Sequence, residues 1–226
     1  MKFISLRVML LLVIAITLSS VVTYPSTHTG VSTSITNPDS LATAYNNRGV
    51  DYAVAGDYEK AGVFFLKSLY VLQQKVHVDS LKIGIGYFNI ANLKMLLGYS
   101  DSALIYYQTS IRYFSKKQSN ESNIAAVYIS MGSCYYSRNE YHEAASFIRQ
   151  GIDMLKDCKP IDNARLVLAN YKLCNVLTKM GQYEEAIRIS VENLELARSK
   201  APERISLISN GIGITYSHLT NFEKTL

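Results

Sequence analysis

The sequence contains no tryptophan, only three cysteines and only four histidines among 226 residues. An odd number of cysteines leaves at least one unpaired, which argues against a disulfide framework. The histidines lie in four different segments without the spacing of a metal site. The sequence also lacks a phosphate loop, a G-x-S-x-G elbow and an H-E-x-x-H helix. We therefore expect no catalytic centre, metal ion, cofactor or small-molecule substrate.

One short stretch imitates a cofactor motif. Gly84 and Gly86 begin like a dinucleotide-binding fingerprint, but Asn89 stands where the third glycine belongs. The stretch also lies at the start of an expected helix of the repeat described below. It is therefore interpreted as structural.

The sequence also has only a small excess of charge of one sign. The 23 Lys and Arg against 18 Asp and Glu give a net charge of +5, and Lys2 and Arg7 near the N-terminus supply two of these charges. The remaining +3 (23 − 2 − 18) gives no strong case for nucleic acid or acidic lipid as a partner. No nucleic-acid partner is predicted.

What the sequence does contain is a repeat. Five times a small residue precedes an alanine-like residue by twelve positions, in the pairs Gly49 and Ala61, Ala91 and Ala103, Gly132 and Ala144, Cys174 and Ala186, and Gly213 and Thr225. The turns between them read GDYEKA, GYSDSA, NEYHEA, GQYEEA and TNFEKT. The alanine-like positions recur at steps of 42, 41, 42 and 39 residues. Self-similarity at such a period is typical of repeat architectures.

Each unit shows helical periodicity on both sides of its turn. Tyr45, Gly49 and Tyr52 lie at i, i+4 and i+7, and the same pattern recurs from Ala61 onward. A constant inner spacing indicates two helices that pack closely through small residues. The predicted repeat-packing positions are Gly49, Ala61, Ala91, Ala103, Gly132, Ala144, Cys174, Ala186 and Gly213. Glycines at the turns suit a left-handed position at a helix C-terminus: Gly56, Gly98 and Gly181.

These residues resemble the tetratricopeptide repeat family. The family motif places a large, a small and an aromatic residue on the first helix, here Tyr45, Gly49 and Tyr52. It places an alanine, a large and a small residue on the second helix, here Ala61, Phe65 and Ser68. The third unit repeats it, whereas Lys94 in the second and Asn170 and Ser190 in the fourth depart from it. The period is about seven or eight residues longer than the usual 34. The resemblance implies an all-α, right-handed α-solenoid of antiparallel helix pairs. Repeats are expected at 41–78, 79–119, 120–160, 161–201 and, incomplete, 202–226.

In this family the first helices of the pairs line a concave groove that holds an extended peptide or a partner helix. The resemblance therefore predicts a protein or peptide partner and these groove residues: Asn46, Val50, Phe88, Asn92, Met95, Ile129, Ser133, Tyr136, Tyr171, Asn175, Thr178, Asn210 and Ile214. Asparagines can pair with a peptide backbone, and the aromatic residues offer apolar pockets. The basic residues with which chaperone-binding members hold a C-terminal carboxylate are missing, because Asn46 and Val50 stand there.

The N-terminus has the pattern of an export signal. Lys2 and Arg7 precede an apolar run over residues 8–22. Fifteen helical residues span only about 22 Å, which favours a cleaved signal over residues 1–23 rather than a membrane anchor. Eight of the fifteen residues from 26 to 40 are Ser or Thr, so residues 24–40 are expected to form a disordered linker.

Two local features complete the structural expectations. Asp39, Asp79 and Asp162 each precede an expected first helix and are predicted to cap it. Cys134 and Cys174 fall on neighbouring helices, where buried free thiols are favoured over a bridge.

The sequence reaches the expected fifth repeat without completing it, so we expect the front part of a longer protein. A signal followed by long-period repeats resembles the exported input region of bacterial membrane sensors, which would attach to the membrane through a missing C-terminal part. The alternatives are a self-contained periplasmic or surface assembly scaffold, or a cytoplasmic peptide-sensing regulator. The last requires an amphipathic leader helix, whereas residues 8–22 are apolar all round. A non-catalytic, exported binding scaffold, periplasmic or membrane-associated, is the resulting hypothesis.

Overall fold

The computed structural model describes residues 37–75, 79–116 and 120–223. Within these ranges the chain forms nine α-helices and one short 3-10 helix: α2 (Pro38–Val54), α3 (Tyr58–Gln73), α4 (Ser80–Leu96), α5 (Ser100–Phe114), α6 (Glu121–Ser137), α7 (Tyr141–Asp157), α8 (Asn163–Lys179), α9 (Tyr183–Lys200), η1 (Pro202–Arg204) and α10 (Ile205–Glu223). None of the helices described is both long enough and apolar enough to cross a membrane. The predicted signal and most of the predicted linker lie outside the described residues.

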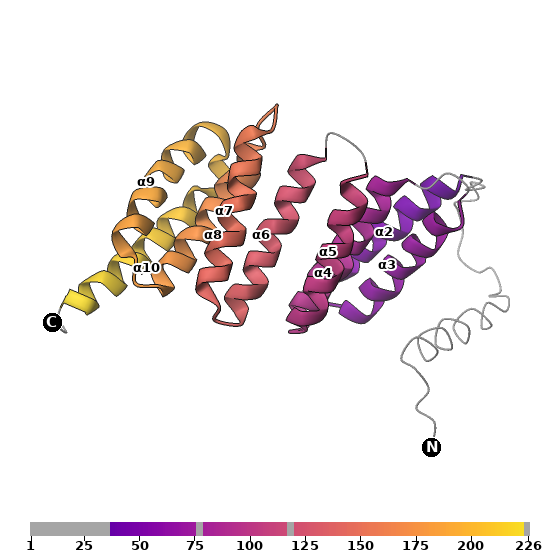
Figure 1. The fold of residues 1–226 in the computed structure, drawn as a ribbon, viewed down its shortest axis with the longest axis horizontal. Coiled ribbons are helices and arrows are strands. Elements are labelled where there is room, and N and C mark those ends of the chain that lie inside the picture. The colour runs from indigo at the N-terminus through magenta and orange to yellow at the C-terminus, as the bar shows by residue number, and fades with distance from the viewer. Residues whose placement is uncertain (1–36, 76–78, 117–119, 224–226) are drawn as a thin grey trace, which may run out of the picture. The chain divides into compact units, whose positions relative to one another are not determined.

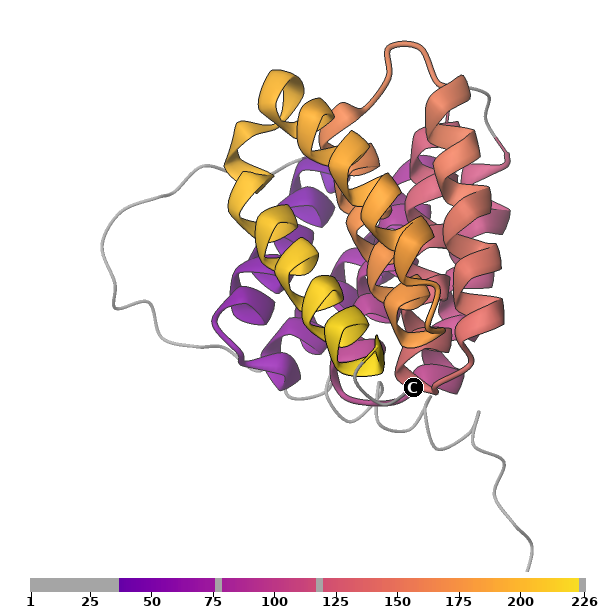
Figure 2. The same ribbon diagram turned by 90° about the vertical axis from the view of Figure 1, so that its left-hand side faces the viewer.

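The helices pack as antiparallel pairs in chain order (Figure 1): α2 with α3, α4 with α5, α6 with α7, and α8 with α9. The second, third and fourth pairs lie inside the repeats expected at 79–119, 120–160 and 161–201, whereas α2 begins at Pro38, three residues before the first expected repeat. The final helix, α10, contacts α8 and lies alongside α9 (Figure 2). The expected all-α fold of antiparallel helix pairs is confirmed.

A residue in the left-handed backbone region closes the first helix of every pair. Gly56 and Gly98 have φ of 81° and Gly181 has φ of 76°, as predicted for these glycines, and Asn139 takes the same role with φ of 62°. In each turn the next residue donates its backbone N–H to the carbonyl five residues earlier, at 2.8–3.0 Å. This bond satisfies a carbonyl that the helix end would otherwise leave unpaired. The same turn chemistry therefore sets the same hairpin four times.

Small residues allow the helices of a pair to approach. A Cβ atom on Gly49 would lie 2.6 Å from the Phe65 ring, and one on Gly132 would lie 2.5 Å from Cγ1 of Ile148. The structure places eight of the nine predicted packing residues in the interior, and Gly213 is the exception.

The second helix of each pair carries a further buried position that touches the backbone of the first. In three pairs a polar side chain donates to a carbonyl 26 residues earlier: Ser68 to Ala42 at 2.7 Å, Ser110 to Gly84 at 3.0 Å, and Asn193 to Val167 at 3.0 Å. In the remaining pair Gly151 occupies this position, and the carbonyl oxygen of Ala125 would lie 2.8 Å from a Cβ there. A small or hydrogen-bonding side chain is required at this contact.

The expected fifth hairpin is absent from the described residues. Helix α10 continues through Thr220, which aligns with the glycines of the earlier turns. A β-branched residue disfavours the positive φ that those turns require, so the helix does not end there. Gly213 is exposed, with no atom within 4 Å of its Cβ position, whereas Gly211 is buried against the Tyr171 ring. The predictions of a packing position at Gly213 and of a turn at Thr220 were therefore wrong, and Thr225 lies outside the described residues.

The first helix begins earlier than the sequence suggested. Asn37 caps α2 by accepting the N–H of Asp39 at 2.9 Å, and Pro38 occupies the first turn, where its missing N–H costs nothing. The predicted linker therefore ended too late, and Asp39 is not the cap. Asp79 and Asp162 do cap α4 and α8, as predicted.

All three cysteines are free, as favoured from the sequence. Cys134 and Cys174 are buried, and burial raises the pKa of both thiols, to about 11 for Cys134. Cys158 is only half-buried. The reactive species is the thiolate, so a buried thiol reacts only after local opening of the fold.

Alkylation with iodoacetamide at pH 8 is therefore expected to modify Cys158 first. Cys134 and Cys174 should react more slowly by on the order of 100-fold, because local opening limits them. Mass spectrometry of the alkylated peptides measures each rate, and denaturant should make all three equal. Two fast thiols in the native chain would contradict the packing described.

Candidate functional site

The first helices of the pairs form a continuous layer. α2 contacts α4, α4 contacts α6, α6 contacts α8 and α8 contacts α10. Within the described ranges the second helices make at most marginal contact with one another. We define the first-helix face as the predicted groove residues on these helices together with their neighbours Thr43, Asn47, Asn89 and Lys172. Within the described ranges each of the four pairs contributes one helix to this layer.

An open depression lies at the N-terminal end of this face. It has a volume of about 400 Å³ and lies between α2 and α4; its lining residues are Asp39, Ser40, Thr43, Ala44, Asn47 and Lys82. A second depression of about 250 Å³ shares Thr43, Asn47 and Lys82 with it and adds the predicted Asn46. Polar groups that could meet a peptide backbone therefore line a hollow surface here.

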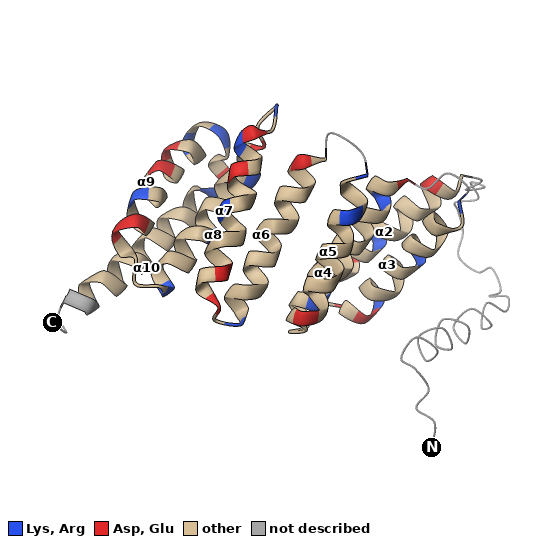
Figure 3. Ribbon diagram, viewed as in Figure 1, with Lys and Arg blue, Asp and Glu red and all other residues tan. Residues whose placement is uncertain are grey.

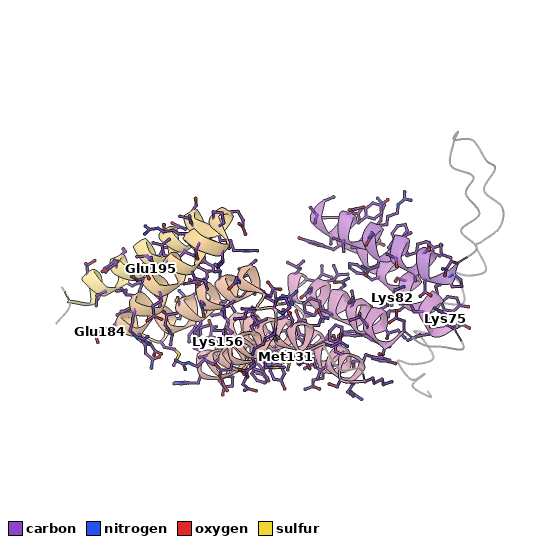
Figure 4. The ribbon with its side chains drawn as sticks, turned by 90° about the horizontal axis from the view of Figure 1, so that it is seen from above. Lys75, Lys82, Met131, Lys156, Glu184 and Glu195 are labelled. Atoms are coloured by element: carbon purple, nitrogen blue, oxygen red, sulfur yellow. The ribbon has the colours of Figure 1, made fainter. Side chains whose placement is uncertain are left out.

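The rim of the depression carries a small charge cluster. Asp39 accepts hydrogen bonds from Lys75 and, at 3.0 Å, from Lys82. Figure 4 labels these two lysines. These two bonds hold the pKa of the Asp39 carboxyl below its usual value. The pairs are partly exposed, so solvent screens them and they contribute little to stability.

Several predicted groove residues are hydrogen-bonded to protein partners. The side-chain oxygen of Asn46 accepts from Asn89 at 2.8 Å, and that of Asn92 accepts from the Tyr107 hydroxyl at 2.6 Å. The NH₂ groups of Asn46 and Asn92 are not used in these bonds. The structure thus fixes the orientation of both amides through their oxygens.

Eleven of the thirteen predicted groove residues are at least partly exposed. Val50, Asn210 and Ile214 are exposed, and the half-buried ones are Asn46, Phe88, Asn92, Met95, Ser133, Tyr136, Tyr171 and Asn175. The ligand-facing role of these eleven stays a prediction.

Ile129 and Thr178 are buried instead, and the prediction was wrong for both. Ile129 packs against Gly151 on α7. The Thr178 hydroxyl donates to the Cys174 carbonyl at 2.8 Å and meets that of Thr215 at 2.9 Å. Both side chains therefore fill space between helices.

Sequence reasoning missed one recurring position on this face. Asn47, Asn89 and Lys172 each follow a predicted groove residue by one position. A helix presents a stripe wider than a single row, so i and i+1 can border the same surface. The recurrence of polar side chains at this position was the signal that could have identified it.

No family model matches the chain, and no curated protein sequence matches it. Solved structures do. BtubC from P. vanneervenii superposes with a TM-score of 0.70 at 15% identity, covering 83% of this chain and 76% of that one. Aspartyl phosphate phosphatase F from Bacillus subtilis gives 0.72 at 11% identity over 85% of this chain and 51% of that one. TPR-like repeats of a Podosopora anserina protein, predicted to be a kinesin light chain, give 0.65 at 11% identity over 84% and 92%. At these identities the likeness shows the fold alone, which is a TPR-like helical repeat.

Proposed function

We propose that this chain is a non-catalytic scaffold that binds an extended peptide or protein segment along the first-helix face. The carrying observation is the row of partly exposed amide, hydroxyl and aromatic side chains on α2, α4, α6 and α8, beside a hollow between α2 and α4. Repeat solenoids commonly bind partners along such extended surfaces.

The chemistry of the face favours a peptide backbone as its ligand. An extended peptide presents alternating N–H and C=O groups, and an asparagine amide matches both with its acceptor and its donors. The donors of Asn46 and Asn92 are already oriented by the bonds from Asn89 and Tyr107. Side chains fixed before binding lose less conformational freedom when the ligand arrives.

Selection of random 12-residue peptides on the purified chain tests this proposal. Binding of the enriched peptides should weaken about ten-fold or more in the double variant N47A/N175A, because two amide hydrogen bonds are lost. The matched control Q108A/Q150A removes two exposed amides from the second helices α5 and α7 and should leave binding unchanged. Failure to enrich any peptide, or equal loss in both variants, would overturn the proposal.

We further propose that the scaffold is exported and acts as the input region of a membrane sensor. Lys2, Arg7 and the apolar run over residues 8–22 support export, and the resemblance to exported repeat regions supports the sensor role. Intact mass of the protein from the cell envelope tests export, since retention of residues 1–19 contradicts a cleaved signal.

Reading the coding sequence beyond Leu226 tests the sensor role against a free scaffold: a transmembrane segment with an output domain supports the sensor.

A further inference from the structure

Acidic residues are nearly absent from the first helices in the middle of the chain. Helices α4, α6 and α8 contain one acidic residue, Glu121 at the start of α6, against five basic ones: Lys82, Lys94, Arg165, Lys172 and Lys179. Figure 3 shows α6 without charge between its two ends. In the pair formed by α8 and α9, the acidic side chains lie on the second helix, α9, at Glu184, Glu185, Glu192 and Glu195. The part of the first-helix face on α4, α6 and α8 would therefore not repel an anionic ligand.

Four of the five basic residues either contact a carboxylate or an aromatic ring or are exposed to solvent. Lys82 pairs with Asp39 at 3.0 Å, and Arg165 lies 3.5 Å from Asp162. Lys94 lies 5.5 Å from the centre of the Tyr99 ring, and Lys179 is exposed. Lys172 is the exception.

Lys172 extends from α8 to α6 across the first-helix face. Its Nζ donates to the Ser133 hydroxyl at 2.7 Å, and among the described residues no Asp or Glu oxygen lies within 4.0 Å of it. An ammonium group has three N–H donors, so this bond leaves donors unused. Burial lowers the pKa of Lys172, because the charged form loses hydration. The adjacent Cys134 thiol has its pKa raised to about 11, so it is not a counter-ion at neutral pH.

We propose that Lys172 is an anion-recognition residue of the first-helix face, and that the peptide bound there carries an Asp or Glu side chain at this point. The proposal rests on the peptide-binding function proposed above. A partly buried cation without a counter-ion gains most from a ligand carboxylate, which restores the lost solvation and fills the unused donors. Nucleic acid fits less well, since it requires many free cations and the other basic side chains of α4 and α8 are paired, stacked or solvated.

The test uses the peptides enriched on the purified chain, each synthesised again with every Asp and Glu replaced by Asn and Gln. The replacement should weaken binding to the unmodified chain by about 10- to 100-fold, as expected for a hydrogen bond between charged groups. It should have no effect on binding to K172M. K172R keeps the charge and should keep the preference for acid, and K179M, on the same helix, should behave like the unmodified chain.

Three outcomes separate the explanations. If the amide peptides bind the unmodified chain as well as the acidic ones, or if K172M still discriminates, the Lys172 proposal is overturned while peptide binding stands. If no peptide is enriched, both the Lys172 proposal and the proposed peptide-binding function are overturned. A purely structural link from Lys172 to Ser133 predicts that K172M and S133A both unfold more easily while the preference for acid persists, which also overturns the proposal. An oligothymidylate that binds in a Lys172-dependent manner, without competition from the peptides, would assign the site to nucleic acid instead.

Discussion

Gly132→Ala is expected to destabilise the fold by about 1–3 kcal/mol, whereas Gly213→Ala is expected to stabilise it by up to about 1 kcal/mol. The two glycines occupy the same position in the sequence repeat. A Cβ atom on Gly132 would lie 2.5 Å from Ile148 Cγ1 and 2.9 Å from the backbone oxygen of Ala144, so α6 and α7 must separate. A Cβ atom on Gly213 meets nothing within 4 Å and gains only the helix propensity of alanine.

Denaturant unfolding followed by far-UV circular dichroism measures both changes as shifts in the transition midpoint. Gly49→Ala is a graded control. Its Cβ would lie 2.6 Å from the Phe65 ring, a side chain that can turn, and no backbone atom is among its nearest neighbours. It should therefore cost less than Gly132→Ala. Shifts of the same sign at Gly132 and Gly213 would show that α10 packs like an ordinary first helix, contrary to the structure.

The contrast between these glycines shows what the repeat pattern could and could not predict. The first four units were predictable because each combines a small pair with a turn residue that accepts positive φ, glycine three times and Asn139 once. The fifth unit kept the spacing but placed Thr220 at the turn, and the helix continued. Spacing alone was therefore insufficient, since the hairpin depends on the backbone freedom of one residue.

The candidate face was predictable only in outline. Helical phase placed eleven of the thirteen predicted residues at exposed or half-buried positions of the first helices, whereas Ile129 and Thr178 lie where a small rotation of the helix separates such a position from the interior. The bond between Asn46 and Asn89 depends on how neighbouring pairs stack, which no spacing within one pair specifies. The same holds for Lys172, whose burial and lack of a carboxylate arise from the packing of α8 against α6.

The hydrophobic core is divided into separate clusters along the chain. A substitution at the junction between clusters is therefore expected to have a large effect on stability. Buried residues form four clusters, each made of neighbouring helices. The cluster that joins α4 and α5 to α6 contains Tyr107, which has no exposed surface and packs against Phe88 with ring centres 5.8 Å apart. In repeat arrays stability is approximately a sum of unit and nearest-neighbour terms. A change at this junction should therefore weaken the coupling between the helices up to α5 and the helices from α6 onward.

Tyr107→Ala is expected to cost about 3–5 kcal/mol, the usual price of truncating a buried aromatic residue. Because the loss falls at the junction, hydrogen exchange measured by mass spectrometry should accelerate in residues 80–137 first, and residues 163–200 should keep their protection longer. Tyr107→Phe is the matched control, since it removes only the hydroxyl that donates to Asn92 and should cost about 1 kcal/mol with no change in the order of exchange. Uniform acceleration over all helices of the alanine variant would mean that the array unfolds as one cooperative unit. The first-helix face, which spans this junction from α4 to α8, would then be held rigid by the whole chain rather than by its local contacts.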